Sequence, residues 1–425
     1  MLLTMSGVGR ESELRGRERW SSQLAAHARH LDVRFGPGPD PRLFFSPGRV
    51  NLMGAHLDYN GGPVMPTAID RGTFIAVRPS RTRKLRLAST LDGATLEADL
   101  ATLSRSRTGW WVDYPLGVVL EILDVVRDRG SARECTGLDV LFGGNLPIGA
   151  GLSSSASICV GMAFALDRTW ELGLERMDLV QAALRAERGF VGVQCGIMDP
   201  YAVGLARAGQ LLWLDCKDAS STYFPIDSTR YAVAVADTLV RRELAQVAFN
   251  ERVRQCRTAF EELRPRQPDA TCLRDIRLET FLDHGGSLEP VVARRAEHVI
   301  REVARTFAAR DALARGDVAG LGAEMFRAHE SLRDLFEVSV PELDRIVASA
   351  ASSSGVLGAR LTGAGFGGCV VILLETGAAL ELADRIALDF EAAFGRRPSI
   401  ELFGGDAGPR EIAGLFNYPT RAGRS

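Results

Sequence analysis

The amino-acid sequence predicts an α+β protein, because strand-like and helix-like segments occur in a mixed order along the chain. Short apolar runs with β-branched residues fill residues 43–77, and a strand-like alternation covers 84–100. Apolar residues recur every three or four positions over 110–129 and 153–172, as in amphipathic helices. The chain has 425 residues. At roughly 100–200 residues per domain, this length predicts two domains or one large bilobed unit.

The first half of the chain is expected to begin with a frayed segment. Residues 1–18 are polar and charged, and residues 19–30 are predicted to form a short helix that the prolines after it end. Leu138–Phe142 is predicted to be a strand that leads into a glycine-rich turn. Another strand is expected at Gln210–Asp215. We therefore assign residues 19–230 to an N-terminal domain.

The second half of the chain is expected to form a C-terminal domain over residues 231–420. A strand over Tyr231–Ala236 begins this domain. Helical periodicity then dominates residues 243–350, apart from a loop at 264–270 where two prolines fall close together. The last expected elements are a strand pair and a helix, at Arg360–Leu374 and 378–394.

The composition argues against several classes of function. Hydrophobic residues make up 46% and charged residues 24%, which is ordinary for a globular protein. No apolar run approaches the roughly 20 residues that span a bilayer. The formal net charge of −2 gives no electrostatic reason to expect nucleic acid. Charged residues near the N-terminus follow no apolar core, so we expect no signal peptide and a cytoplasmic protein.

The cysteines and lysines further limit the kinds of site that the sequence predicts. The seven cysteines are scattered and include no Cys-x-x-Cys pair, so the sequence predicts neither a disulfide framework nor a zinc site. Lys84 and Lys217 are the only lysines. A Gly-Lys-Ser/Thr phosphate loop is therefore excluded, and any cationic partner of a phosphate group must be an arginine.

A glycine-rich turn opens directly into a predicted helix at Leu146–Ser157. Its glycines can adopt positive φ and let the backbone approach a ligand, while the N–H groups and dipole of the helix attract an anion. The serines that follow can donate to phosphate oxygens or ligate a metal ion that travels with a nucleotide. On these residues alone, simple helix capping explains the serines equally well. The candidate cradle consists of Gly149, Ala150, Gly151, Leu152, Ser153, Ser154 and Ser155.

Three further segments accompany this loop in a fixed order. They are Ser46–Gly62, which reads SPGRVNLMGAHLDYNGG, then Gly189–Asp199, and finally Leu361–Cys369, which reads LTGAGFGGC. Together with the loop, they resemble the galactokinase branch of the GHMP small-molecule kinases. The resemblance implies a two-lobed GHMP kinase fold with the active site between the lobes. It also implies ATP-dependent phosphorylation of the anomeric hydroxyl of a galactose-type sugar.

The resemblance implies roles for individual residues. Arg49 and Asp199 match the family's catalytic arginine and aspartate. Asp199 would orient or deprotonate the anomeric hydroxyl, while Arg49 would stabilise the transferring phosphoryl group and keep Asp199 ionised. Ser155 and Glu187 would hold Mg²⁺ together with the bound ATP. Judged only by its arginine neighbours, Glu187 would instead be a solvated helix residue.

The predicted sugar pocket departs from the family pattern at two positions. Asp58 matches the aspartate that binds the 3- and 4-hydroxyls, and His56 is also kept. Ala55 stands where galactokinases have a glutamate that accepts a hydrogen bond from the 6-hydroxyl, and Phe249 stands where they have a tyrosine. Losing a buried acceptor costs roughly 1–3 kcal/mol of galactose binding. The predicted sugar contacts are Arg49, Ala55, His56, Asp58, Gly196, Asp199 and Phe249.

These departures leave the substrate open. Plant galacturonokinases, which the chain also resembles, have the same Gly-Ala-His sequence, and losing a carboxylate removes its repulsion of a sugar acid. D-galacturonate is therefore the alternative to galactose, and a pentose such as arabinose is a third candidate. The intact serine loop disfavours a non-catalytic galactose and ATP sensor, and the N-terminal signature disfavours a mevalonate or homoserine kinase. We expect a monomer or weak homo-oligomer that binds a small-molecule sugar and ATP, with no nucleic acid and no membrane.

Overall fold

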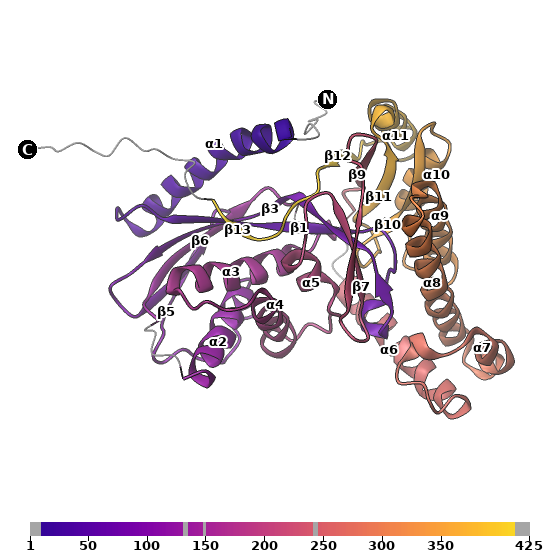
Figure 1. The fold of residues 1–425 in the computed structure, drawn as a ribbon, viewed down its shortest axis with the longest axis horizontal. Coiled ribbons are helices and arrows are strands. Elements are labelled where there is room, and N and C mark those ends of the chain that lie inside the picture. The colour runs from indigo at the N-terminus through magenta and orange to yellow at the C-terminus, as the bar shows by residue number, and fades with distance from the viewer. Residues whose placement is uncertain (1–9, 131–134, 148–149, 241–244, 413–425) are drawn as a thin grey trace, which may run out of the picture.

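The computed structural model describes residues 10–130, 135–147, 150–240 and 245–412, which form two lobes side by side (Figure 1). Strands and helices are mixed in both lobes, and this confirms the predicted two-lobed α+β architecture. A six-stranded sheet organises the first lobe and a four-stranded sheet the second, with a further three-stranded sheet. None of the helices in these residues has the length and apolar character needed to cross a membrane.

The six-stranded sheet has the strand order β13-β1-β3-β6-β4-β5. Helix α1 covers one face, and α2 to α5 cover the other (Figure 1). Phe45 packs towards α1 and its neighbour Phe44 towards α3, so both faces of β1 are covered and the strand is almost continuously buried. The bounds are β1 (Arg42–Asn51), β3 (Pro66–Pro79), β4 (Lys84–Ser89), β5 (Asp92–Asp99), β6 (Leu138–Gly144), β13 (Arg410–Glu411), α1 (Arg10–Phe35), α2 (Asp113–Asp128), α3 (Ser154–Trp170), α4 (Arg176–Arg185) and α5 (Met198–Gly204).

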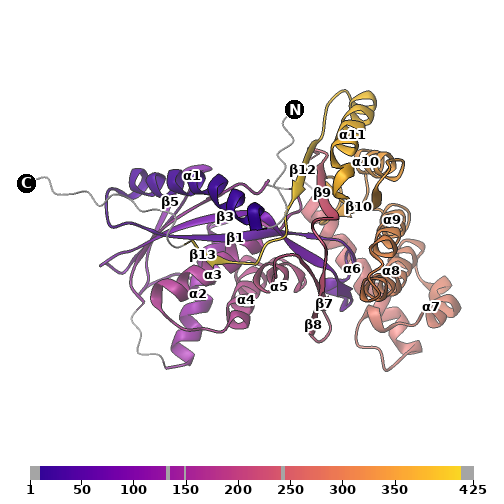
Figure 2. The ribbon, with the colours of Figure 1, turned by 45° about the horizontal axis from the view of Figure 1, so that its top comes forward.

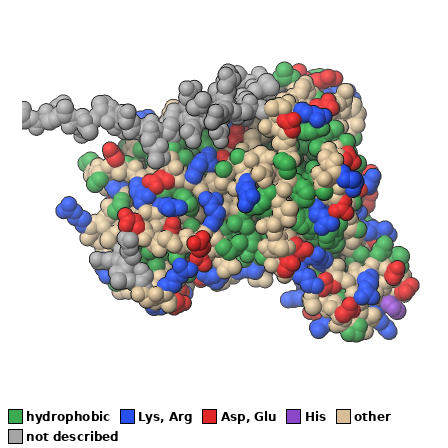
Figure 3. Space-filling view, viewed as in Figure 1, with side chains coloured by type: hydrophobic (Ala, Val, Ile, Leu, Met, Phe, Trp, Pro, Cys, Tyr) green, Lys and Arg blue, Asp and Glu red, His purple; other side chains and the backbone are tan. Residues whose placement is uncertain are grey.

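The four-stranded sheet of the second lobe has the order β10-β11-β9-β12, and the small sheet has the order β2-β7-β8. The strand bounds are β9 (Tyr231–Asp237), β10 (Val356–Thr362), β11 (Cys369–Glu375), β12 (Ser399–Phe403), β2 (Pro63–Val64), β7 (Gln210–Asp215) and β8 (Ser221–Pro225). The helices are α6 (Ala245–Leu263), α7 (Leu278–His284), α8 (Pro290–Ala314), α9 (Val318–Asp334), α10 (Pro341–Ala351) and α11 (Ala379–Phe394). On the face shown in Figure 3, acidic and basic side chains are intermixed.

Most elements agree with the sequence-based expectations, and α1 is the clearest difference. The helix runs from Arg10 to Phe35, well beyond the predicted 19–30. Its apolar residues Trp20, Leu24 and Leu31 are buried against the sheet. Residues 1–9 of the segment that we expected to be frayed lie outside the described residues. The predicted loop at 264–270 begins with a short 3₁₀ turn at Arg264–Arg266.

The end of the described chain returns to the first lobe. After β12, strand β13 pairs with β1, with Phe44 opposite Glu411 (Figure 2). The C-terminal segment thus contributes to the sheet of the N-terminal lobe. The domain boundary near residue 231 stays a prediction.

The pairing of β1 with β3 is irregular next to the functional site, where the register of β1 skips Asp70 and Arg71 of β3. The register of β1 against β3 shifts between Pro47 and Gly48. A Cβ atom on Gly48 would lie 2.8 Å from the carbonyl oxygen of Leu152, so glycine lets the glycine–serine loop pack directly onto the strand. The N–H of Arg49 donates to the same carbonyl oxygen at 3.1 Å. This hydrogen bond therefore holds Arg49 beside the loop.

Candidate active site

An ion pair between Arg49 and Asp199 lies at the centre of the site. Arg49 belongs to β1, and Asp199 belongs to the first turn of α5. Arg49 Nε donates to Asp199 Oδ1 and Arg49 Nη2 donates to Oδ2, both at 2.8 Å, so the pair is bidentate. The guanidinium is buried, whereas 28% of the Asp199 side chain is exposed. The structure thus brings these two residues together, and their catalytic roles remain a prediction.

The glycine–serine loop connects this ion pair to the start of α3. Ser153 Oγ donates a hydrogen bond to Asp199 Oδ2, and Arg49 Nη1 donates to the carbonyl oxygen of Gly151 at 2.6 Å. Gly151 (φ +76°) and Ser153 (φ +60°) adopt left-handed conformations, which let the chain turn sharply into the helix. The 17-residue helix directs its free N–H groups and the positive end of its dipole at the loop. This geometry suits a phosphate group.

The second glycine-rich turn, between β10 and β11, packs against this loop. A Cβ atom on Gly363 would lie 3.0 Å from Gly151 Cα, and one on Gly151 would lie 3.3 Å from the carbonyl oxygen of Thr362. The two backbones therefore approach so closely that glycine is favoured on both sides. Leu152 and Ala150 are buried in the loop, and Gly149 lies outside the described residues.

Glu187 is buried, so its interpretation as a solvated helix residue is wrong. Helix α4 ends at Arg185, and Ala186–Val191 continue the chain as a π-helical turn, a feature often found at functional sites. The Glu187 side chain lies inside the protein, with the residue only 3% exposed. Burial raises the pKa of Glu187 to about 7, although a hydrogen bond with Ser155 acts in the opposite direction. The two predicted metal ligands therefore lie in contact.

These two oxygen donors fit a magnesium ion that is bound together with a nucleotide. Mg²⁺ prefers oxygen ligands and usually takes only one or two from the protein, completing its shell with phosphate oxygens and water. Among the residues that the structure describes, no group of three or more His, Cys, Asp or Glu side chains could hold a metal ion by itself. A metal at Ser155 and Glu187 would thus depend on the nucleotide.

A cavity of about 140 Å³ opens beside the ion pair. All the residues predicted to contact the sugar line this cavity, although they come from β1, the segment after it, the segment before α5, α5 itself, and α6. Six further residues line the cavity that the sequence had not assigned to the sugar; five of them lie within the quoted motifs, and only Arg360 lies outside them. These residues are Asn51, Cys195, Met198, Arg360, Gly363 and Ala364.

Asp58 is held against Gly196 in this cavity. A Cβ atom on Gly196 would lie 2.0 Å from Asp58 Oδ2, so only glycine leaves room for the carboxylate. Burial, followed by the nearby Asp199 carboxylate, raises the pKa of Asp58 to about 6. At neutral pH, Asp58 is therefore mostly ionised and can accept hydrogen bonds from neighbouring hydroxyl groups.

His56 and Phe249 form an aromatic wall of the cavity. Their ring centroids lie 5.8 Å apart, and His56 Nδ1 lies 2.9 Å from the hydroxyl oxygen of Tyr59. Burial lowers the pKa of His56 well below its ordinary value, so the imidazole is neutral at physiological pH. The wall supplies shape and a hydrogen-bonded imidazole, and no charge.

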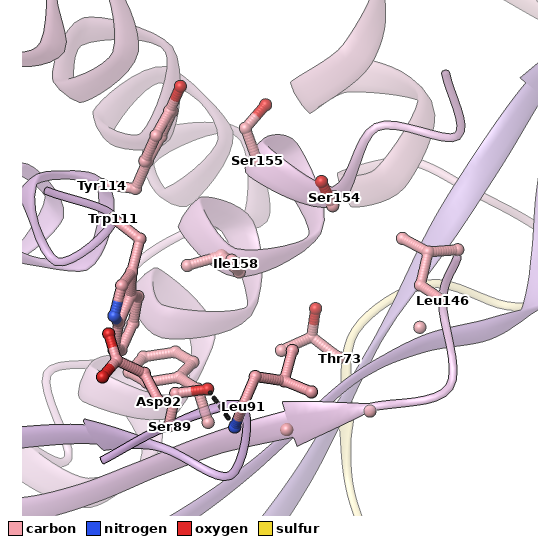
Figure 4. A pocket seen from close by; sticks show the side chains of 14 residues that line it. Thr73, Ser89, Leu91, Asp92, Trp111, Tyr114, Leu146, Ser154, Ser155 and Ile158 are labelled. Carbon is pink, nitrogen blue, oxygen red and sulfur yellow. Dashed lines mark hydrogen bonds between the residues drawn. The ribbon is translucent and has the colours of Figure 1, made fainter. Parts of the chain in front are cut away.

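A larger cavity of about 420 Å³ begins at the first turn of α3 (Figure 4). Ser154 and Ser155 lie at one end, while Trp111, Leu91 and Ile158 provide apolar walls. A cleft of this size, with apolar walls and hydroxyl groups at one end, suits a flat base with a phosphate chain. Sequence reasoning missed these walls because they come from separate elements. The two adjacent tryptophans before α2 were the one feature of the sequence that could have indicated these apolar walls.

Comparisons with known proteins agree with this geometry. Three family models match the chain: the galactokinase galactose-binding signature over residues 32–79, the GHMP kinases N terminal domain over 117–207, and the GHMP kinases C terminal over 309–392. The chain is 36% identical to the galactokinase of Clostridium beijerinckii over 374 residues, which cover 87% of this chain and 94% of that protein. It is 40% identical to the galactokinase of Chloroflexus aggregans over 342 residues, which cover 80% and 86%.

Solved structures show the same relationship. The galactokinase of Lactococcus lactis, complexed with galactose, superposes with a TM-score of 0.86 and 30% identity, covering 92% of this chain and 100% of that one. A mevalonate kinase superposes with a TM-score of 0.60 at 19% identity, covering 86% and 99%. The second similarity shows a shared fold alone.

The two-lobed fold and the matched N- and C-terminal models define the class of this protein as the GHMP kinases. The galactose-binding signature and the full-length similarity to curated relatives are more specific. The chain belongs to the galactokinase family.

Proposed function

We propose that the protein transfers the γ-phosphoryl group of ATP to the anomeric hydroxyl of galactose, giving galactose 1-phosphate and ADP. As a member of its family it is a sugar kinase. The observation that carries the proposal is the position of the Arg49–Asp199 pair. This pair is hydrogen bonded to the phosphate loop through Ser153 and Gly151, and it also lines the sugar cavity. A group placed between both cavities can act where nucleotide and sugar meet.

In this proposal, each polar group at the junction has one task. Asp199 holds the anomeric hydroxyl in line and accepts its proton. Arg49 keeps Asp199 ionised and faces the charge on the transferring phosphoryl group. Ser155 and Glu187 would hold Mg²⁺, which supplies charge neutralisation at the phosphates when it is bound.

We place ATP in the larger cavity, with its base among the apolar walls near Trp111 and Ile158 and its phosphates towards Ser154 and Ser155. The start of α3 then faces the phosphate chain, where its N–H groups and dipole are favourable. The Ser153–Asp199 hydrogen bond links this end of the cavity to the sugar site.

Galactose is the favoured acceptor over D-galacturonate. The curated relatives described above are galactokinases, and they support galactose as the principal substrate. Neither of these relatives is named a galacturonokinase. Asp58 is available for the 3- and 4-hydroxyls, with a neutral wall at His56 and Phe249. The intact loop and ion pair also argue against a sensor that binds without turnover.

The remaining expectations belong to the same proposal. With a formal net charge of −2, the protein has no electrostatic reason to bind nucleic acid. We infer that it acts in the cytoplasm as a monomer or weak homo-oligomer.

The variant Asp199→Asn tests the proposed mechanism. Asparagine has the size of aspartate but cannot take the proton of the sugar hydroxyl, so kcat with galactose is expected to fall by about 100-fold or more. ADP release under saturating Mg-ATP measures kcat, and calorimetry should show ATP binding close to that of the unaltered protein. Asp283→Asn, an exposed change on α7, serves as the control. A kcat near the original value in Asp199→Asn would refute the assignment.

A further inference from the structure

Arg360 is a fully buried cation that lines the sugar cavity. It lies on β10, in the second lobe, and its side chain has 0% exposed surface. Its Nε donates to the carbonyl oxygen of Leu361 at 2.9 Å. Both Nη atoms, in contrast, have no hydrogen-bond partner within the described residues. Because buried polar groups in native proteins are nearly always hydrogen bonded, these free donors are suited to a ligand.

The groups around Arg360 do not balance its charge. The Oε1 atom of buried Glu302 lies 3.7 Å from Arg360 Nη1, an ion-pair distance without a hydrogen bond. Glu302 instead accepts hydrogen bonds from the N–H of Gly54 at 3.2 Å and from Arg305 Nε at 2.7 Å. One carboxylate therefore faces two guanidinium groups, so the three side chains carry a net charge of +1.

The other titratable groups near the cavity do not neutralise the charge of Arg360. Arg49 is already paired with Asp199. The ionised Asp58 also lines the cavity, but the charges that act on Arg360 are those of Glu302, Arg305 and Arg49. Burial lowers the pKa of His56 well below its ordinary value and that of His298 to about 3, so both imidazoles are neutral. Burial also lowers the pKa of Arg360, to about 10, and the guanidinium still remains protonated at neutral pH.

Position 55 offers no acceptor to this cation. Ala55 follows Gly54, whose N–H holds Glu302, and its methyl group lines the same cavity as Arg360. A methyl group cannot accept a hydrogen bond or carry a negative charge. The cavity therefore presents a cation whose missing partner must come from the ligand, since a buried charge without a partner is costly.

We propose that Arg360 is a specificity-determining residue that binds the substituent at C6 of the sugar, so that the protein phosphorylates hexuronic acids of galactose configuration as well as galactose. The inference rests on the proposed function. Transfer uses the hydroxyl at C1, and C6 is the carbon whose oxidation adds a carboxylate without changing that acceptor or the ring hydroxyls. Guanidinium N–H groups match the two oxygens of a carboxylate and can also donate to a neutral 6-hydroxyl.

The reaction is the same with either sugar. A bond forms between O1 of the sugar and the γ-phosphorus, and the bond from that phosphorus to the leaving oxygen of ADP breaks. The proton of the O1 hydroxyl passes to Asp199. Arg360 takes no part in these steps and acts only on which sugar is bound.

Kinetics with galactose and D-galacturonate test this inference in the matched variants Ala55→Glu and Ala55→Gln. The two introduced side chains have the same length, and only glutamate adds a charge that can pair with Arg360 and repel a 6-carboxylate. We expect the ratio of kcat/KM for galacturonate to that for galactose to be about 30-fold or more lower in Ala55→Glu than in Ala55→Gln, the scale of a buried charge contact. Equal ratios would overturn the inference.

The variant Arg360→Met tests the arginine directly, because it removes the uncompensated charge and leaves Glu302 in its hydrogen-bonded pair with Arg305. Galacturonate turnover should fall by about 30-fold or more relative to galactose turnover in the same preparation. Equal losses for both sugars would contradict a role in specificity. If the unaltered protein phosphorylates galactose but not galacturonate, this inference is overturned and the proposed function still stands. Turnover of neither sugar would overturn the proposed function.

Discussion

At the scale of single residues, the ionisation of Asp58 governs the sugar cavity. Its pKa is raised to about 6 from an ordinary value of 3.8, chiefly by burial and then by the Asp199 carboxylate. Because the pKa is higher in the folded than in the unfolded state, ionising Asp58 lowers the free energy of unfolding as the pH rises from 3.8 to about 6. Above about pH 6, the ionised carboxylate can accept hydrogen bonds from a sugar, and the free energy of unfolding is lower by the amount lost on ionisation.

The same pKa predicts the pH dependence of catalysis. We expect kcat/KM for galactose to fall as the pH drops below about 6, because a protonated Asp58 accepts hydrogen bonds from the sugar less well. The variant Asp58→Asn should show lower kcat/KM at high pH and should lack this acid limb. Profiles of kcat/KM between about pH 5 and pH 8 for both proteins measure the effect. An identical acid limb in Asp58→Asn would show that another group is responsible.

Residue-level prediction succeeded where a motif carried the information. The sequence predicted Arg49 and Asp199 as a functional pair although they are far apart in the chain, and the structure gives them two hydrogen bonds at 2.8 Å. It did not predict that Arg360 lacks hydrogen-bond partners on two atoms, because that depends on where the fold places Arg360 of β10 relative to Glu302 of α8. The sequence also did not predict that Glu187 is buried, because its neighbours in sequence are charged.

At the scale of elements, glycines determine how closely separate segments approach. Gly48 lets the phosphate loop contact β1, Gly151 and Gly363 let two glycine-rich turns meet, and Gly196 leaves room for Asp58 before α5. In each case, the atoms that a Cβ on the glycine would meet belong to a segment distant in sequence. These contacts join the phosphate loop, the second glycine-rich turn and the sugar cavity into one site.

Gly196→Ala is expected to damage sugar binding selectively. The new methyl group would lie 2.0 Å from Asp58 Oδ2, so the carboxylate must move out of place. Removing its hydrogen bonds should raise KM for galactose by at least about 10-fold, since the net cost of a buried charged hydrogen bond is about 1.5–3 kcal/mol. Calorimetric binding of ATP should change little.

Gly286→Ala provides the matched control, because its added Cβ meets no atom within 4 Å. A galactose KM in Gly196→Ala equal to that of this control would show that the contact between Gly196 and Asp58 does not position the carboxylate for the sugar.

Sequence periodicity predicted most elements because their apolar residues repeat with the period of the strand or helix that they form. The strand at Leu138–Gly144 and the helix at Ser154–Trp170 follow this rule. The π-helical turn at Ala186–Val191 does not, because one widened turn leaves no repeating signal. The extent of α1 was also missed, since its N-terminal residues are polar and its boundary depends on packing against the sheet.

At the scale of the whole molecule, the sugar cavity joins the two lobes. Arg49 and Asp58 come from the first lobe, while Phe249 and Arg360 come from the second. The sequence predicted this arrangement only through the family resemblance, because periodicity does not specify how two sheets face each other. The loop–loop contact between Gly151 and Gly363 then places the phosphate cradle at the same junction.

The position of the new phosphate group on the sugar tests the central claim most directly. The protein would be incubated with galactose and Mg-ATP, and the product examined by phosphorus–proton correlated NMR. The arrangement of Asp199 between the two cavities predicts a phosphorus coupled to the anomeric proton, as in galactose 1-phosphate, together with an equal amount of ADP. Phosphate on any other carbon, or ADP release without a sugar phosphate, would contradict the account.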